Sequence, residues 1–297
     1  MSNAEIDIIR AQLAASPRPA DMAGRRARMN ALGSRYKPPA DVRIEPVSAN
    51  GVAAEWTTTP EADTSRVLMF LHGGGYVSGS LESHRHLVAQ AGREARARTL
   101  ALAYRLAPEH PFPAALDDAL AGYRFLLAQG IAPKRIALCG ESAGGGLAVA
   151  AMVSLRDTGD PLPACAWLSS PWTDLGQTGE TMRTKELVDP LIDKPYLDEL
   201  AAAYLRGTDA NNPLVSPIHA DLHNLPPFLI YAGSAETLLD DSVRLAAVAG
   251  AAGVRVTLDI WPDMIHAFTV FHPEVAVARR ALVKLGAFVQ SVTGSGS

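Results

Sequence analysis

Residues 139–146 read Cys-Gly-Glu-Ser-Ala-Gly-Gly-Gly, and this stretch decides the fold because it places one serine in a glycine-rich turn. At average residue usage, a chain of this length contains a Gly-x-Ser-x-Gly pattern by chance about one time in ten, so the flanking residues must be considered. The apolar run Ile136–Cys139 precedes the turn, and a stretch of small residues compatible with a helix begins at Ala143. The segment therefore predicts a buried strand, a sharp turn at Ser142 and a helix.

Strand-like runs alternate with helical patterns through most of the chain. Between Leu71 and Cys139 the runs are short, apolar and barely alternating, which is typical of strands buried on both faces. Ala49-Asn50-Gly51 joins the first two runs and indicates a hairpin, so we expect the sheet to begin antiparallel. The alternation predicts an α/β fold with a mostly parallel sheet covered by helices. The predicted strands are Val42–Val47, Val52–Trp56, Val67–Leu71, Thr99–Ala103, Ile136–Cys139, Ala164–Leu168, Phe228–Tyr231 and Val254–Trp261.

Composition excludes several classes of protein. The chain has 297 residues, a net charge of −4 and 48% hydrophobic residues, and its mild, dispersed acidity argues against binding to nucleic acid or to an anionic membrane surface. No run approaches the roughly 18 apolar residues of a membrane span, and the acidic N-terminus does not resemble a signal peptide. Cys139 and Cys165 both lie in apolar runs, so we expect buried, reduced thiols and a cytoplasmic location.

Two segments depart from the alternation. Residues 1–40 carry two amphipathic helical patterns, and residues 176–206 form another helical insertion. Ligands bind at the carboxyl ends of the strands in open α/β sheets, so we predict that both segments cap a catalytic domain of residues 41–292. The alternative is a peripheral packing helix with a surface excursion, and residues 293–297 are predicted to be a flexible tail. The predicted inner face of the cap comprises Leu13, Met22, Met29, Leu187, Leu197 and Leu200.

Ser142 is the candidate nucleophile. A strand, a Gly-x-Ser-x-Gly turn and a helix are the context of a nucleophile elbow, in which a strained turn exposes the serine hydroxyl. The helix that follows directs its dipole and free N–H groups at the serine oxygen. The other interpretation, a glycine-rich turn feeding a buried helix, assigns the serine no chemistry.

A serine hydroxyl needs a base to accept its proton and a carboxylate to orient that base. His266 lies in the loop after the last predicted strand, where the base of this fold class belongs. His272, next to Pro273, is expected to be a solvated residue at a helix start. Three carboxylates follow the strand that ends near Tyr231; Glu236 comes earliest and is the preferred acid, and Asp240 is the alternative.

Backbone N–H donors are needed for the negative charge that develops on a tetrahedral intermediate. His72-Gly73-Gly74-Gly75 follows a buried strand, and glycines leave their N–H groups unshielded. We predict that the N–H groups of Gly74, Gly75 and Ala143 form an oxyanion hole, with Gly73 completing the loop. His72 is expected to hold this loop by hydrogen bonds rather than to transfer protons.

Three motifs together resemble the bacterial hormone-sensitive-lipase-like esterases of the α/β-hydrolase superfamily. They are HGGGY at 72–76, YRLAPEHPFPAALDD at 104–118 and GESAGGG at 140–146, and the resemblance covers roughly residues 40–292. It implies the α/β-hydrolase fold with an eight-stranded sheet and a helical cap, a Ser–carboxylate–His triad, no cofactor, and homodimers. The family's acid is usually the first Asp of Asp-Pro-Leu-x-Asp, and that position here is Glu236. The family's serine motif commonly has Asp where this chain has Glu141.

The sequence thus predicts a serine carboxylesterase that hydrolyses short-chain esters through an acyl-enzyme. A lactone or amide hydrolase with the same residues is the alternative, since acyl-transfer machinery does not fix the leaving group. A non-catalytic small-molecule receptor would have a broken triad. We expect no metal, because His84-Arg85-His86 is the only close histidine pair and lacks nearby carboxylates at ligand spacing. In the motif at 104–118 we expect Glu109 and Asp117 to anchor the loop.

Overall fold

The computed structural model describes residues 4–294 and contains one eight-stranded sheet of order β1-β2-β4-β3-β5-β6-β7-β8. β2 runs antiparallel to β1 and β4, and the remaining neighbours are parallel. All eight predicted strands are confirmed, as is the hairpin, in which Asn50 and Gly51 have φ of 52° and 94°. The strands are β1 Arg43–Ala49, β2 Val52–Thr58, β3 Asp63–Leu71, β4 Ala97–Leu102, β5 Ile136–Glu141, β6 Cys165–Ser169, β7 Phe228–Gly233 and β8 Val256–Trp261.

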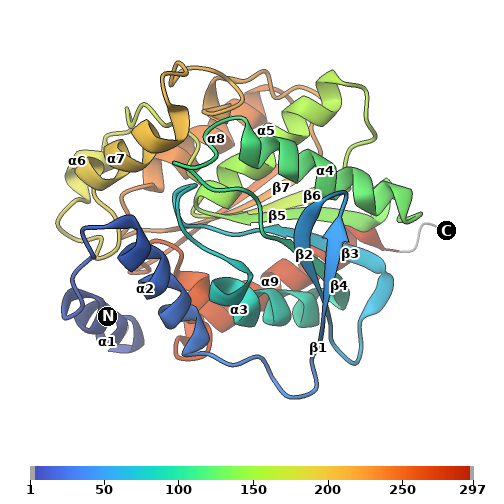
Figure 1. The fold of residues 1–297 in the computed structure, drawn as a ribbon, viewed down its shortest axis with the longest axis horizontal. Coiled ribbons are helices and arrows are strands. Elements are labelled where there is room, and N and C mark those ends of the chain that lie inside the picture. Colours follow the sequence, from blue (N-terminus) through green and yellow to red (C-terminus); the bar gives the residue numbers. More distant parts are fainter. Residues whose placement is uncertain (1–3, 295–297) are drawn as a thin grey trace.

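Helices cover both faces of the sheet (Figure 1). α3 (Leu81–Ala95) and α9 (Ala276–Thr293) pack on one face, and α4 (Ala114–Ala128), α5 (Ala143–Asp157) and α8 (Leu239–Ala251) pack on the other. Short 3₁₀ helices lie at Pro133–Arg135 (η1), Pro217–His219 (η2) and Phe268–Phe271 (η3). No helix within residues 4–294 is long and apolar enough to cross a membrane.

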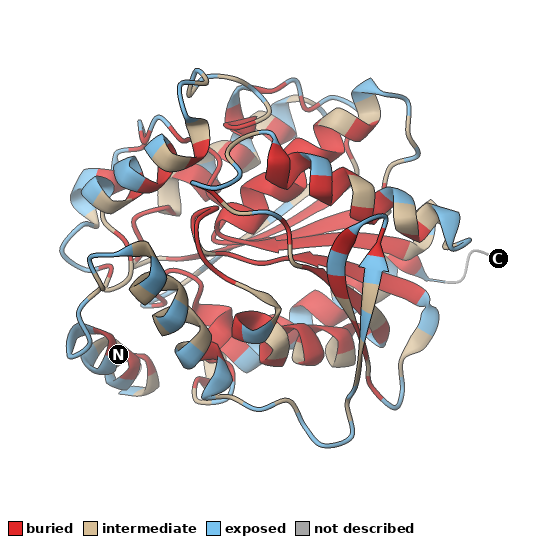
Figure 2. Ribbon diagram, viewed as in Figure 1, coloured by how far each residue is buried: buried red, intermediate tan, exposed pale blue. Residues whose placement is uncertain are grey.

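The core has two halves, one on each side of the sheet. On β3, Met69 and Leu71 belong to the cluster beneath α4 and α5, whereas Leu68 and Phe70 belong to the cluster beneath α3 and α9. Successive side chains of a strand point to opposite faces, so a strand covered by helices on both sides must be apolar throughout. Figure 2 shows the result as a continuous band of buried residues along the central strands.

The two segments outside the alternation lie on the same side of the molecule (Figure 1). The N-terminal segment forms α1 (Ala4–Ala14) and α2 (Met22–Ser34), and the insertion forms α6 (Thr181–Thr184) and α7 (Lys194–Leu205). Ion pairs join them: Arg25 binds Glu199 at 2.8 Å, and Arg18 binds Asp193 at 3.1 Å. The pairs hold two segments, far apart in sequence, against one another.

Two expectations about these peripheral residues need correction. Leu187, assigned to the inner face of the cap, is 98% exposed because α6 ends at Thr184 and the chain then leaves the helical pattern. Thr293, assigned to the tail, lies inside α9, is buried, and accepts a hydrogen bond from Arg66. The rest of the predicted tail, apart from Gly294, lies outside the described residues.

Candidate active site

Ser142 lies at the turn between β5 and α5, with φ 54° and ψ −120°. The turn leaves no room for side chains on either side of the serine. A Cβ on Gly140 would lie 2.1 Å from the carbonyl oxygen of Gly144, and one on Gly144 would lie 2.0 Å from that of Leu71. This is why the sequence needs glycine two residues before and two residues after the serine.

His266 lies in the loop between β8 and η3, directly beside Ser142. The Ser142 Oγ lies 2.9 Å from the His266 Nε2 and can donate a hydrogen bond to it. The serine is 8% exposed and the histidine 5%, so the contact is shielded from solvent yet reachable. The predicted nucleophile and base are therefore within proton-transfer distance.

Glu236 lies behind His266, in the loop after β7. Its Oε2 is 3.9 Å from the Nδ1 of His266, which is within ion-pair range but longer than a hydrogen bond. The same oxygen accepts hydrogen bonds from the Ser170 hydroxyl at 2.7 Å and the Gly233 N–H at 3.1 Å. Complete burial raises the pKa of Glu236 well above its usual value, against the effect of the Ser170 hydrogen bond, and the charge of Asp189 raises it further.

Ser170 is a residue of this site that sequence reasoning missed. Besides binding Glu236, its hydroxyl accepts a hydrogen bond from the N–H of Ala267 at 3.1 Å. It therefore ties the carboxylate to the loop that carries His266. Its left-handed backbone, with φ of 48°, directly follows β6, and no motif in the sequence marks it.

Asp240, the alternative acid, has a different set of contacts. Its Oδ2 accepts a hydrogen bond from the Thr181 N–H at 3.0 Å, and the Thr181 hydroxyl accepts one from the Asp240 N–H at 3.0 Å. These bonds join α8 to α6. Of the two candidates, Glu236 is the one placed against His266.

The glycine loop after β3 faces the serine turn. Gly74 and Gly75 have φ of 119° and 63°, which side chains rarely adopt. Within residues 4–294, their N–H groups donate to no protein acceptor, and Ala143 as the first residue of α5 has no helical partner for its own. These three predicted donors are thus free for a ligand oxygen.

His72 supports this loop, as the sequence predicts. Its Nδ1 lies 2.8 Å from the Gly73 carbonyl oxygen, and its ring stacks on that of Tyr104 with centroids 4.2 Å apart. The Tyr104 hydroxyl donates to the His72 carbonyl at 2.6 Å. Burial lowers the pKa of His72 to about 3, so the ring is neutral at pH 7.

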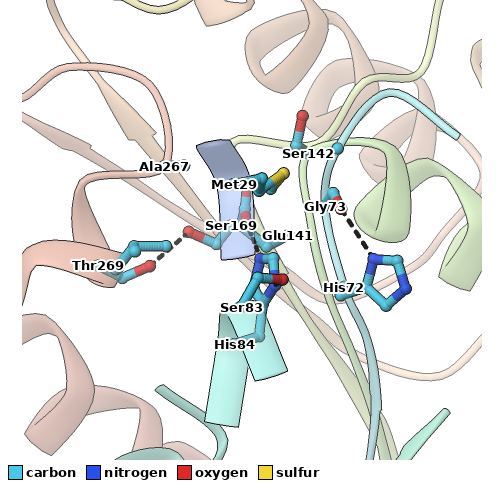
Figure 3. Close-up of polar contacts among 12 residues, drawn as sticks. Met29, His72, Gly73, Ser83, His84, Glu141, Ser142, Ser169, Ala267 and Thr269 are labelled. Atoms are coloured by element: carbon cyan, nitrogen blue, oxygen red, sulfur yellow. Dashed lines mark hydrogen bonds and ion pairs between the residues drawn. The ribbon is translucent and has the colours of Figure 1, made fainter. Parts of the chain in front are cut away.

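Glu141 explains the departure from the family's serine motif. Its buried carboxylate accepts a hydrogen bond from the His84 Nε2 at 2.8 Å (Figure 3). The His84 Nδ1 is in turn 2.8 Å from the Ser83 hydroxyl in the first turn of α3. A Cβ on Gly73 would lie 2.6 Å from the same carboxylate. Glu141 therefore fills the space beneath the glycine loop, and His84 binds its carboxylate there. The sequence did not predict this contact of His84.

A cavity with a volume of about 160 Å³ opens at Ser142 and His266. Four of the predicted inner-face residues line it; Met22 packs against the core without reaching it, and Leu187 faces solvent. Leu200 lies closest to the glycine loop, since a Cβ on Gly75 would be 2.3 Å from its Cδ1. The four inner-face residues are Leu13, Met29, Leu197 and Leu200.

Anchoring of the loop at 104–118 differs in one residue from the expectation. Glu109 binds Arg26 of α2 at 2.7 Å, as an anchor should. Asp118, rather than Asp117, holds the other end, because its carboxylate accepts from the N–H and the guanidinium of Arg105, both at 2.7 Å. Asp118 is buried, so its carboxylate lies where the loop residue Arg105 can bind it.

His272 was also expected to be solvated, and it is instead buried. Its ring stacks on that of His86 with centroids 5.5 Å apart.

Within the described part of the chain, no three His, Cys, Asp or Glu side chains gather in a way that could hold a metal ion.

A sheet of this topology with a serine turn at its centre defines an α/β hydrolase, and comparison with known proteins gives the same result. A family model described as alpha/beta hydrolase fold matches residues 68–270. An acetyl-hydrolase of Streptomyces hygroscopicus is 47% identical over 90% of this chain and 87% of its own, and an esterase of Acinetobacter venetianus is 34% identical over 84% and 83%.

Among solved structures, an esterase from the bacterial hormone-sensitive lipase family superposes with a TM-score of 0.97 at 42% identity, covering 99% of this chain and 100% of that one. The chain belongs to the α/β-hydrolase superfamily and, within it, to the bacterial hormone-sensitive-lipase-like esterases.

Proposed function

We propose that the protein is a serine carboxylesterase that hydrolyses short-chain esters through an acyl-enzyme on Ser142. One observation carries the proposal: the Ser142 Oγ lies 2.9 Å from the His266 Nε2, at the mouth of a cavity that also reaches Gly74 and Gly75. A nucleophile, a base and free N–H donors then surround one point where an ester carbonyl can sit.

Acylation begins when the Ser142 Oγ attacks the carbonyl carbon and its proton passes to the His266 Nε2. The carbonyl oxygen becomes an oxyanion, which accepts hydrogen bonds from the N–H groups of Gly74, Gly75 and Ala143. The C–O bond to the alcohol then breaks, and the imidazolium of His266 returns the proton to the departing oxygen. Throughout, the Glu236 carboxylate stabilises the imidazolium.

Deacylation repeats these steps with water in place of the serine. His266 accepts a proton from the water as its oxygen attacks the acyl carbon, and the same three donors hold the second oxyanion. Breakage of the bond to the Ser142 Oγ releases the acid and returns the proton to the serine. No cofactor takes part in either half.

The size of the cavity supports a preference for short acyl chains. Its volume is about 160 Å³, and an engineered cavity of about 150 Å³ holds one benzene molecule. A longer chain would overpack the apolar lining, which includes Leu197 and Leu200. We therefore expect activity to be highest for acyl groups of about two to six carbons.

Replacement of the nucleophile tests the function. Ser142→Ala should lower kcat for p-nitrophenyl butyrate by about three orders of magnitude or more, because only the oxyanion hole and binding remain. Its circular dichroism and Tm should match those of the wild type. A fluorophosphonate should label the wild type at Ser142 and leave the variant unlabelled.

A lactone and an amide of similar size, assayed alongside the ester, establish the preferred bond. Turnover by Ser142→Ala near the wild-type rate, or labelling at another residue, would exclude Ser142 as the nucleophile. If the lactone or the amide is turned over faster than the ester, the protein is a lactone or amide hydrolase rather than a carboxylesterase.

We propose that the protein forms homodimers through the edge of the sheet at β8. Edge strands leave N–H and C=O groups unpaired, and the edge strand β8 carries Ile260, which is 45% exposed. Light scattering should give twice the mass of one chain, and Ile260→Lys should shift the protein toward monomers. A monomeric wild type at micromolar concentration contradicts this.

We also propose a cytoplasmic location. Both Cys139 and Cys165 are buried free thiols, so the fold uses no disulfide between them. Proteins of reducing compartments are built this way. Fractionation of the source cells, with activity recovered outside the cytoplasm, would contradict the proposal.

A further inference from the structure

One face of α2 supplies polar groups as well as apolar ones to the cavity. Arg25, Arg28, Met29 and Leu32 follow the spacing of one helical face, and all four line the cavity. Arg18, in the loop before α2, lines it as well. Three arginines therefore line the same cavity as Ser142.

Two of these arginines are neutralised by the cap. Arg25 binds both carboxylate oxygens of Glu199 at 2.8 and 2.9 Å. Arg18 binds Asp193 at 3.1 Å and lies over the ring of Tyr196, 3.7 Å from its centroid. Each therefore has a structural reason to be present.

Arg28 has no such partner. Within residues 4–294 its guanidinium makes no hydrogen bond and no ion pair, although it is only partly exposed. Burial lowers its pKa and the neighbouring charge of Arg18 lowers it further, so the surroundings disfavour the cation. An arginine nevertheless remains protonated in proteins, and a partly buried cation without a counter-ion is costly.

The other charges around the cavity do not offset this one. The Glu141 carboxylate is bound to His84, and the Glu236 carboxylate lies behind His266 and does not itself line the cavity. Among the arginines that line the cavity, Arg28 is therefore the one without an ion pair or hydrogen bond within residues 4–294. An arginine presents its donors in a planar fork that matches a carboxylate.

We propose that Arg28 binds a carboxylate of the substrate, so that the preferred substrates are short esters carrying one negative charge. This inference rests on the proposed esterase function. The carboxylate belongs to the acyl part or to the alcohol part of the ester, a few bonds from the scissile carbonyl. The bound anion is the counter-ion of Arg28, as Asp193 and Glu199 of the insertion are for Arg18 and Arg25.

Two matched pairs of substrates test the charge on each part separately. Monoethyl succinate and ethyl 4-oxopentanoate differ in the acyl part, where a carboxylate replaces a methyl ketone of similar size. 3-Acetoxypropanoate and 4-acetoxy-2-butanone differ in the same way in the alcohol part. We expect the wild type to have the higher kcat/KM for the anion in at least one pair, with the preference reduced by 0.5 M NaCl.

The variant Arg28→Gln should lower kcat/KM for the preferred anion by about tenfold, mainly through KM, and change kcat/KM for its neutral partner less than twofold. Tenfold corresponds to about 1.4 kcal/mol, which is modest for a charge-assisted hydrogen bond. Arg183→Gln is the control, because it removes the same charge from an exposed position in the insertion. It should leave both rates unchanged.

The inference is overturned if the wild type prefers the neutral ester in both pairs, or if Arg28→Gln lowers both members of a pair equally. Either result leaves the esterase function intact, because the neutral esters are still hydrolysed by the wild type and not by Ser142→Ala. Failure to hydrolyse any of the four esters would instead contradict the proposed function itself.

Discussion

At the scale of single residues, the Glu236 carboxylate is held by groups that oppose its burial. Desolvation favours its protonated form, whereas hydrogen bonds from Ser170 and Gly233 favour the ionised one. Its Oε2 lies 3.9 Å from the His266 Nδ1, within ion-pair range. When catalysis charges His266, Coulomb attraction in this buried site gains strength, so Glu236 acts chiefly on the transition state.

Replacing the acid tests this assignment. Glu236→Gln retains the shape of the side chain and removes the charge that stabilises the imidazolium, so we expect kcat to fall by about two to four orders of magnitude. Asp240→Asn breaks only contacts with Thr181 and should lower kcat less than fivefold. Steady-state rates on p-nitrophenyl butyrate measure both effects.

Thermal unfolding of the two variants provides the control, since each removes a charge from a helix–loop junction. If Asp240→Asn loses more activity than Glu236→Gln at equal Tm, Asp240 is the triad acid. Glu236 would then have only a supporting role beside His266.

The residues that could be predicted from sequence are those whose neighbours in the chain define them. Ser142, its glycines and the HGGG loop occur in motifs because a tight turn admits few residue types. Ser170, His84 and Arg28 could not be predicted in this way. Each has its role through contacts with a segment far away in the chain, such as the hydrogen bond between His84 and Glu141. A local sequence pattern does not predict such long-range contacts.

At the scale of elements, the cap sets the size of the site. α7 brings Leu200 against Gly75, where the Cδ1 would lie 2.3 Å from a Cβ on the glycine. Position 75 must therefore be a glycine as long as the Leu200 side chain occupies the space beside it. The wall of the cavity is built jointly by the sheet domain and by the insertion.

Truncating this wall should change selectivity for chain length. Leu200→Ala opens space beside the oxyanion loop, so we expect the preferred p-nitrophenyl ester to lengthen by about two to four carbons. The rate on the acetate should fall, because a small acyl group is then held less tightly. Rates across esters of two to twelve carbons measure the shift.

Leu187→Ala is the matched control, since it removes the same atoms from an exposed position in the same insertion. Its profile should be that of the wild type. An unchanged profile in Leu200→Ala would mean that the acyl chain binds elsewhere in the cavity.

Prediction at this scale succeeded where one period persists through a segment. The eight strands and the long helices have clear patterns because the sheet buries one side or both of each. The insertion was harder, because α6 has four residues and the chain is irregular from Lys185 to Asp193. A helical period extended through that irregular stretch is what placed Leu187 wrongly on the inner face.

At the scale of the whole molecule, buried histidines link stability to pH. Burial lowers the pKa of His72 and of His86 to about 3 and that of His272 to about 4, all below the value of about 6.5 in an unfolded chain. Each therefore contributes stability that is fully present above pH 6.5 and is lost as the pH falls toward the folded pKa. Acid must charge groups that the fold keeps neutral.

The His86–His272 stack permits a direct test of this linkage. The His86 Nε2 lies 2.9 Å from the Val270 carbonyl oxygen and can donate to it, a bond that the amide of His86→Gln can replace without titrating. Between pH 6 and pH 4 the wild type should lose free energy of unfolding more steeply than the variant, by about 1.4 kcal/mol per pH unit. Urea unfolding at several pH values measures both slopes.

Tyr36→Phe separates titration from packing in the same experiment. The Tyr36 ring lies 5.0 Å from that of His86, and its own pKa is raised by burial, so the phenol does not ionise in this range. Above the pH range in which glutamates ordinarily titrate, this variant should lose a constant amount of stability and keep the slope of the wild type. That loss includes the hydrogen bond that the Tyr36 hydroxyl donates to Glu274. Parallel slopes for His86→Gln and the wild type would mean that His86 is charged in the folded state as well as in the unfolded one. The loss of stability in acid would then have to arise from His72 and His272 alone.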